Sequence, residues 1–146
     1  MLTHELIKIF KRDLEKLSNQ IQLFENEKDL WLKRKNISNS PGNLCLHIIG
    51  NLKHFVGHVL GNTDYIRDRE HEFSAKNISK KALIQQIEET KVIVEQTLRK
   101  LDEDQLNTNF PIDVFKETNS VSFFLIHLST HLSYHLGQIN YFRRLL

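Results

Sequence analysis

The chain has 146 residues, of which 40% are hydrophobic and 26% are charged. This length and composition are typical of one globular domain and exclude a disordered or fibrous protein, so we expect a single domain over residues 1–146. Lys and Arg number 20 against 18 Asp and Glu, a balance that does not favour nucleic acid or an anionic membrane as a partner. The eight histidines are the unusual feature of the composition.

The only cysteine, Cys45, cannot form an internal disulfide or a cysteine-rich zinc site, which favours a reducing compartment. The N-terminal residues are charged and amphipathic and lack the apolar core of a signal peptide. The longest segment without Asp, Glu, Lys or Arg, 118–142, contains histidines and amides and is a poor transmembrane candidate. We therefore expect a cytoplasmic protein with no membrane-spanning segment.

Residues 2–32 predict a long amphipathic helix, because apolar side chains recur at three- and four-residue steps from Leu6 to Trp31. Residues 40–60 predict a second helix, with Ser40 as its N-cap and Pro41 at its first position. The segment that follows, 62–78, is rich in charge and is interpreted as a solvated crossover.

A third helix is predicted to begin near Ser79. Residues 102–119 form a connector in which Ile112–Phe115 is a weak candidate for a short extended piece, and a fourth helix covers residues 120–146. Four helices of this length predict an all-α protein built as a four-helix bundle. The first helix is also a candidate dimer interface, and we expect a homodimer.

Six histidines fall on the second and fourth predicted helices, which carry few charges and are therefore expected to be largely buried. The remaining two, His4 and His71, are expected at the surface. Buried imidazoles need polar partners, and a cluster of them favours a metal site over isolated core histidines. The six are His47, His54, His58, His127, His131 and His135.

The spacing of the histidines favours pairs that share a helix face. His131 and His135 are four residues apart, so both rings can reach one metal ion. His127 and His135 are separated by a rise of roughly 12 Å and cannot share an ion. His54 and His58 form a second pair with the same spacing, so spacing alone leaves three sites open: His131/His135, His127/His131, or the pair on the second helix.

His47 has the most apolar sequence setting of the three histidines on the second helix, whereas His54 and His58 lie nearer its polar exit. A His47 that faces His131 and His135 would complete a three-histidine site with open coordination positions, the pattern of catalytic zinc. Gln138 and Asn51 are candidates to orient a ligand ring or a bound water.

Several motifs are absent. Residue 132 is Leu, so the fourth helix lacks the HExxH of zinc proteases, and no Glu-x-x-His, GxGxxG or Walker sequence occurs. No carboxylate lies near His131 or His135 in the sequence, so the catalytic residues stay unknown; Tyr134 and Gln138 are weak candidates to assist. Cys45 is interpreted as a small core residue.

Two segments carry a resemblance to a known family. Residues 42–51 (GNLCLHIIGN) and 131–139 (HLSYHLGQI) resemble the DinB/YfiT-like metalloenzyme superfamily, in particular an uncharacterised branch with LLLHLxGN and HxxxHxGQI motifs. Residues 68–73 also resemble that branch. The resemblance implies a four-helix bundle and a divalent ion, commonly nickel or zinc, whose ligands would be His47, His131 and His135.

Characterised relatives include thiol-dependent transferases, which implies a small-molecule substrate and the use of a low-molecular-weight thiol. Our first functional hypothesis is therefore a metal-dependent enzyme that activates a thiol, as an S-transferase, or water, as a hydrolase. The alternatives are a non-enzymatic metal-binding stress-response protein and a helical dimerisation module whose histidines only fill polar core positions.

Overall fold

The computed structural model describes residues 1–146, and its regular secondary structure consists of helices without strands, which confirms the all-α prediction. It contains six α-helices, one 3₁₀ helix (η1) and one π-helix (η2), and its only β-type pairing is an isolated bridge between Asn109 and Ser120. In chain order the elements are α1 (Leu2–Leu23), η1 (Glu27–Trp31), α2 (Pro41–Leu52), η2 (Lys53–Leu60), α3 (Arg69–Ser74), α4 (Lys80–Arg99), α5 (Glu103–Leu106) and α6 (Val121–Arg144).

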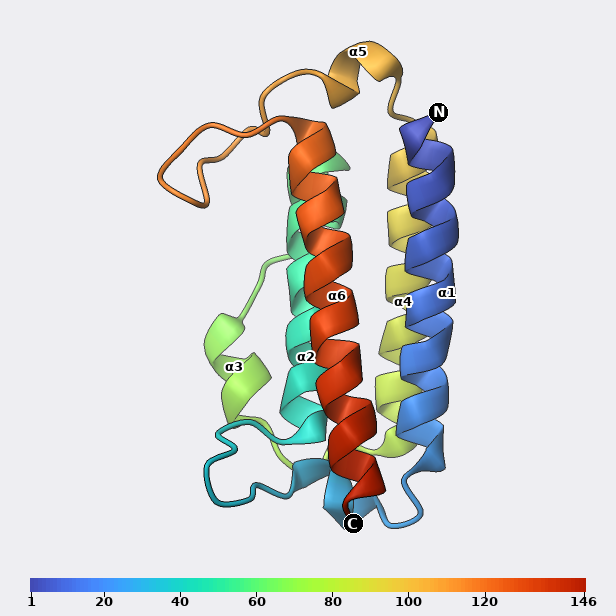
Figure 1. The fold of residues 1–146 in the computed structure, drawn as a ribbon, viewed down its shortest axis with the longest axis vertical. Helices are drawn as coiled ribbons and strands as arrows, with labels where there is room; N and C mark the ends of the chain where they lie inside the picture. Colours follow the sequence, from blue (N-terminus) through green and yellow to red (C-terminus); the bar gives the residue numbers. More distant parts are fainter.

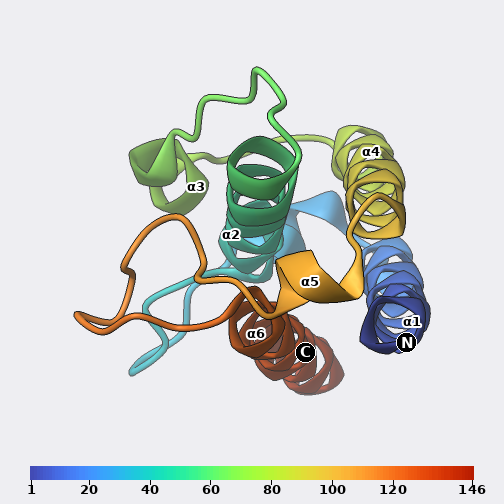
Figure 2. The same ribbon diagram turned by 90° about the horizontal axis from the view of Figure 1, so that it is seen from above.

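Four long helical segments lie side by side: α1, α2 with its continuation η2, α4 and α6 (Figure 1). α1 contacts α4 and α6, α2 contacts α6, and η2 contacts α4, so the four segments surround one core. α3 packs on the side of α2 that faces away from α1 and α4 (Figure 2). The pairing of α2 with both α6 and α3 is the part of the fold that builds the site described below.

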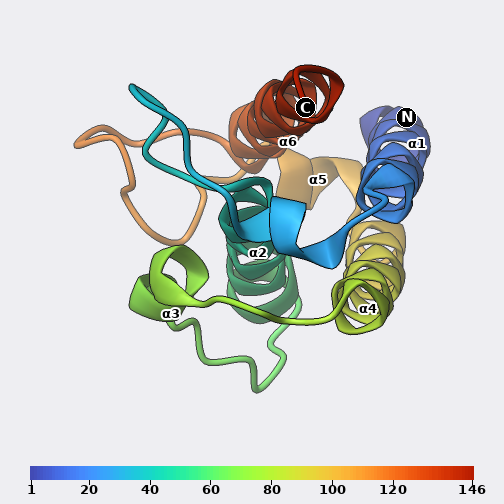
Figure 3. The same ribbon diagram turned by 90° about the horizontal axis from the view of Figure 1, so that it is seen from below.

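The first helix is shorter than predicted, because α1 ends at Leu23 and Phe24 turns the backbone to an extended conformation. The carbonyl oxygens of Gln22 and Phe24 accept hydrogen bonds from Lys80 Nζ, which satisfies groups that a longer helix would have paired. η1 then forms separately, between α1 and α2 at the lower end of the molecule (Figure 3). Its Leu30 is buried like Phe24, so the apolar periodicity continues although the helix does not.

The helix starts agree with the predictions, including the N-cap predicted for Ser40. Ser40, Ser79 and Ser120 each accept a hydrogen bond from the backbone N–H three residues later, at the starts of α2, α4 and α6. The second helix ends near Leu60 as predicted, but its last eight residues are the π-helix η2, which the sequence pattern does not reveal. π-Helical turns are uncommon in proteins, and those that do occur often lie beside functional sites.

The two long connectors differ from their predictions. Segment 62–78 is not simply a solvated crossover, because it contains α3 and buries the side chains of Glu72 and Ala75. Segment 102–119 contains α5, and Asp102 and Gln105 form a capping box at the N-terminus of this helix. The extended piece predicted at Ile112–Phe115 is wrong, because these residues form bends without strand pairing.

α1 directs its apolar stripe into the core, where Leu6, Phe10, Leu14, Leu17 and Ile21 are almost fully buried. Cys45 is also fully buried within the core cluster, and burial raises the pKa of its thiol, which agrees with its interpretation as a core residue. None of the helices combines the length and apolar content that a membrane crossing needs.

Candidate metal centre

Three histidine rings from two neighbouring helices meet at one point. His47 lies on α2, and His131 and His135 lie one turn apart on α6. The Nε2 atom of His131 is 3.1 Å from Nε2 of His47 and 3.1 Å from Nε2 of His135. The metal-binding atoms of all three rings lie within 4.8 Å of one another, so the structure brings together the three residues that the sequence analysis selected.

A buried carboxylate fixes the proton on the His47 ring. Nδ1 of His47 is 3.1 Å from Oε1 of Glu72, and both side chains are about 95% buried. An ionised carboxylate only accepts hydrogen bonds, so the contact with Glu72 assigns a proton to Nδ1 of His47, from which Nη2 of Arg67 is 3.3 Å away. In the neutral ring with this proton, Nε2 presents a lone pair toward His131.

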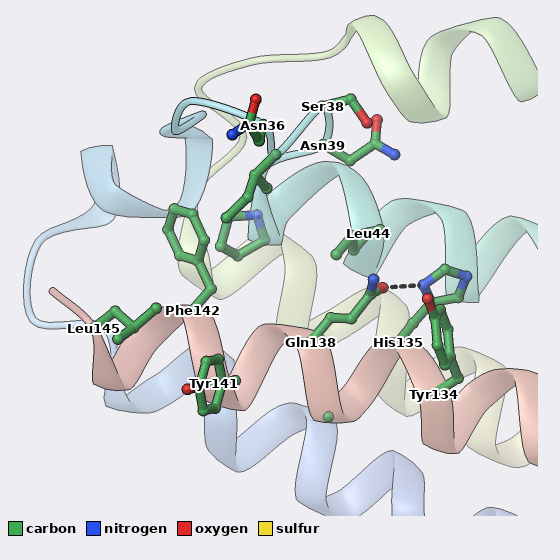
Figure 4. A pocket seen from close by; sticks show the side chains of 13 residues that line it. Asn36, Ser38, Asn39, Leu44, Tyr134, His135, Gln138, Tyr141, Phe142 and Leu145 are labelled. Atoms are coloured by element: carbon green, nitrogen blue, oxygen red, sulfur yellow. Dashed lines mark hydrogen bonds between the residues drawn. The ribbon is translucent and has the colours of Figure 1, made fainter.

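A side-chain amide contacts the Nδ1 atom of the His135 ring. Nδ1 of His135 lies 2.7 Å from Oε1 of Gln138, one turn further along α6 (Figure 4). With Nδ1 as the donor to this oxygen, Nε2 of His135 also presents a lone pair toward His131. Gln138 thus has the orienting contact predicted for it, whereas the side-chain oxygen of Asn51 is buried without a hydrogen-bond partner.

Arg67 holds Glu72 in place. Its guanidinium donates from Nε to Oε2 of Glu72 at 2.9 Å and from Nη2 to Oε1 at 3.0 Å, a bidentate ion pair with little solvent exposure. Burial by itself would raise the pKa of the Glu72 carboxyl, but hydrogen bonds from His47 and Arg67 and the charge of Arg67 bring the pKa below its ordinary value. Glu72 is therefore ionised at neutral pH.

The docking of α3 on α2 depends on two α2 residues. The amide of Asn43 donates to the backbone carbonyls of Glu72 and Ala75, at 3.0 and 2.9 Å. Gly50 supplies the space for the carboxylate, because a Cβ atom at this position would lie 1.9 Å from Oε2 of Glu72. α3 thus brings one buried carboxylate, that of Glu72, to His47. The other acidic residue of this helix, Glu70, is exposed.

The charge state of the cluster suits a cation. Burial, together with the adjacent His135 and His47 rings, lowers the pKa of His131 to about 3, and burial also lowers the pKa of His135. Both rings are therefore neutral at pH 7. Neutral imidazole is the form that binds metal ions.

The donor set fits a divalent metal ion. Three nitrogens about 2.0–2.1 Å from one ion, at angles between octahedral and tetrahedral values, lie about 2.8–3.4 Å apart. The separations of His131 Nε2 from the other two Nε2 atoms, 3.1 Å each, fall in this range, and all three ligand atoms lie within 4.8 Å of one another. A proton between the rings would satisfy this donor set less well than a metal ion, because Nε2 of His131 could donate it to only one of the two lone pairs that face it. The role of the three histidines as ligands stays a prediction, and the geometry supplies its basis.

The other five histidines of the chain lie away from the point where the three rings meet. His54 is half-buried and His58 is exposed, so both are wetter than His47, as expected. His127 packs its ring on Phe115, with ring centroids 4.7 Å apart. His4 and His71 are at the surface, as predicted.

Sequence reasoning missed Glu72 and Arg67. It found no carboxylate close to His131 or His135 in the chain, whereas the structure places one against His47, 25 residues away. The available signal was Gly50, because a glycine inside an apolar helix indicates close approach by another group.

Comparison with known proteins gives a family but no activity. No curated protein matches the chain. The model of the family described as "Protein of unknown function (DUF1572)", which is in the DinB/YfiT-like superfamily, matches residues 3–146. Since the match spans nearly the whole chain, the protein belongs to this family of unknown function.

Proposed function

We propose that the protein binds one divalent metal ion through His47, His131 and His135 and is an enzyme that uses this ion to activate a small thiol or water. The observation that carries the proposal is the convergence of three Nε2 atoms, two of which have their lone pairs fixed by Glu72 and Gln138. Nickel and zinc are the ions that the family resemblance favours.

Each residue has a distinct part in this proposal. A divalent ion held by three neutral imidazoles supplies a Lewis acid that lowers the pKa of a thiol or water bound to it. Glu72 holds the His47 tautomer, and Gln138 holds that of His135. Because Glu72 is already bonded to Arg67 and His47, we assign it to positioning and not to proton transfer.

We also infer that α1, α2 with η2, α4 and α6 correspond to the four-helix bundle of the DinB/YfiT-like proteins. Their closed ring of contacts supports this assignment. A homodimer and a cytoplasmic location remain proposals that follow from the sequence.

Metal analysis of untagged protein tests the site. We expect about one divalent ion per chain in the wild type and loss of the ion in the double variant His131→Ala/His135→Ala. His58→Ala is the matched control, because it removes a histidine outside the cluster. Full occupancy in the double variant, with the fold intact by circular dichroism, would contradict the assignment.

Activity assays on the metal-loaded protein separate the two reaction types. An S-transferase consumes a low-molecular-weight thiol together with an electrophile such as 1-chloro-2,4-dinitrobenzene, and a hydrolase cleaves p-nitrophenyl esters without a thiol. Either activity should disappear on metal removal and return with the ion. Absence of turnover across both panels, with the ion bound, would contradict the enzymatic part of the proposal.

One observation favours a second candidate, a protein in which the ion is structural. The three histidines come from α2 and α6, and His47 and His131 are 84 residues apart in the chain, so a shared ion would cross-link these helices. A large rise in melting temperature with metal and no turnover is the result that this candidate predicts.

A further inference from the structure

A cavity of about 730 Å³ lies beside the histidine cluster, between α6 and the loop that precedes α2 (Figure 4). His135 and Gln138 form one part of its wall, Tyr141 lies further along α6, and Leu145 lies just past the end of that helix. A volume of this size suits a small organic molecule. The cavity therefore adjoins the candidate metal centre and is separate from the three converging nitrogens.

The wall of the cavity carries no Asp, Glu, Lys or Arg. In the metal-free protein, burying an ionised group against such a wall is unfavourable, because no side chain in the wall supplies an opposite charge to compensate for its lost hydration. Tyr134 and Tyr141 supply large aromatic surfaces on α6, and Leu44 adds an aliphatic surface from α2. The lining favours an uncharged ligand with an aromatic or apolar body.

Hydrogen-bond donors are also available in the wall. The side-chain oxygen of Gln138 is bonded to His135, which leaves the NH₂ group of the same amide as a donor. Across the cavity, Asn36, Ser38 and Asn39 lie on the loop, and Figure 4 shows their polar ends pointing away from Gln138. A carbonyl oxygen on the ligand would match the donor that Gln138 supplies.

Gly137 provides an independent observation. It lies inside α6 and lines the cavity, and a Cβ atom at this position would meet nothing within 4 Å. Glycine inside a helix costs about 1 kcal/mol relative to alanine, and no packing contact within the chain requires it here. The absent side chain keeps the helix surface open for a group that lies against it.

We propose that this cavity binds an uncharged molecule with an aromatic or apolar body and a carbonyl-type acceptor, and that Gly137 keeps the space for it. The inference names the substrate class of the site proposed above and rests on that function. The cavity would hold such a substrate against His135, next to the activated thiol or water.

Two isosteric probes test the charge preference. We would titrate the metal-free full-length protein, in which no ion can attract the carboxylate, with neutral 2-naphthamide and with anionic 2-naphthoate and follow the backbone amides by two-dimensional NMR. The chain has five glycines, so the Gly137 signal is readily assigned. We expect the amide probe to shift Gly137 and to bind at least tenfold more tightly than the carboxylate; equal affinity, or shifts confined to other regions, would overturn the proposal.

Two variants at one position test the role of Gly137. Gly137→Leu should weaken 2-naphthamide binding at least tenfold by filling the cavity, whereas Gly137→Ala adds one methyl group and should keep the affinity within about threefold. Neither variant should melt below the wild type, because both residues favour the helix over glycine. Wild-type affinity in Gly137→Leu would overturn the proposal.

Two further measurements distinguish ligand binding at the cavity from dimerisation and from metal binding. A wild-type dimer that becomes monomeric in Gly137→Leu, by light scattering, would assign the face to a second copy of the chain and overturn ligand binding. Metal uptake is measured separately on portions of the same preparations. Probe binding to protein that takes up no metal would support ligand binding at the cavity and contradict the proposed function. Metal uptake without probe binding would support the metal site and contradict ligand binding at the cavity.

Discussion

The carboxylate of Glu72 lies 3.1 Å from Nδ1 of His47, although the two residues are 25 positions apart and Glu72 sits in a highly charged segment. This contact makes α3 part of the candidate metal centre. A carboxylate that orients a histidine increases the basicity of the ring nitrogen that faces the metal. Substitutions of Glu72 and of the residues around it should therefore change metal affinity and stability together.

Glu72→Gln should weaken metal binding about 10- to 100-fold. The amide keeps the size of the side chain and can still accept from His47, but it removes the negative charge that increases the basicity of the imidazole. Affinity would be measured by competition with a chromophoric chelator. Glu70→Gln on the same helix is the matched control, because Glu70 is exposed; equal affinities in the two variants would show that Glu72 does not support the site.

Arg67→Met should lower the free energy of unfolding by about 3 kcal/mol, because it leaves the buried carboxylate of Glu72 without its cationic partner. The double variant Arg67→Met/Glu72→Gln should recover part of this loss, since no unpaired charge remains. Urea unfolding of the metal-free proteins measures both values. Strict additivity of the two single substitutions would mean that the ion pair has no coupling energy.

The sequence allows prediction of the helices and of the three histidines that meet. It does not allow prediction of Glu72, which orients His47, or of Arg67, which holds Glu72. Serine caps mark the starts of α2, α4 and α6, and the four-residue spacing places His131 and His135 on one face. His47 joins them through its apolar setting and the family resemblance. α3 has only six residues, too few for a periodic pattern to indicate which side of it is buried.

The end of α1 illustrates the same limit in the fold. Phe24 and Leu30 continue the apolar pattern and are buried, so the local sequence looks helical across the break. What stabilises the break is a tertiary contact, the hydrogen bonds from Lys80 to the last carbonyls of the helix. A contact between residues more than 50 positions apart leaves no mark in the local pattern.

Gly50→Ala should destabilise the protein and weaken metal binding, although alanine normally favours a helix by about 1 kcal/mol over glycine. The added Cβ would overlap Oε2 of Glu72, and the carboxylate cannot move without breaking its bonds to Arg67 or His47. Thermal melting and chelator competition measure the two effects. Gly137→Ala is the matched control, because its Cβ meets no atom and the same substitution should there be stabilising; a stabilising effect at both positions would contradict the tight fit of Glu72 against α2.

The metal-free protein should lose stability as the pH falls below about 6.5. In the unfolded chain His131 takes up a proton near its ordinary pKa of 6.5, whereas in the folded protein its pKa is about 3, chiefly because the ring is buried. Between these values the unfolded state binds more protons, so the free energy of unfolding decreases as the pH is lowered. The lowered pKa values of His135 and Glu72 act in the same direction, the latter below its ordinary value of 4.5. Urea midpoints at pH 7.5 and pH 5.0 measure the effect, and His131→Gln, which removes the titrating ring, should show a smaller difference between the two midpoints. An equal difference in the two proteins would mean that His131 is not held neutral by the fold.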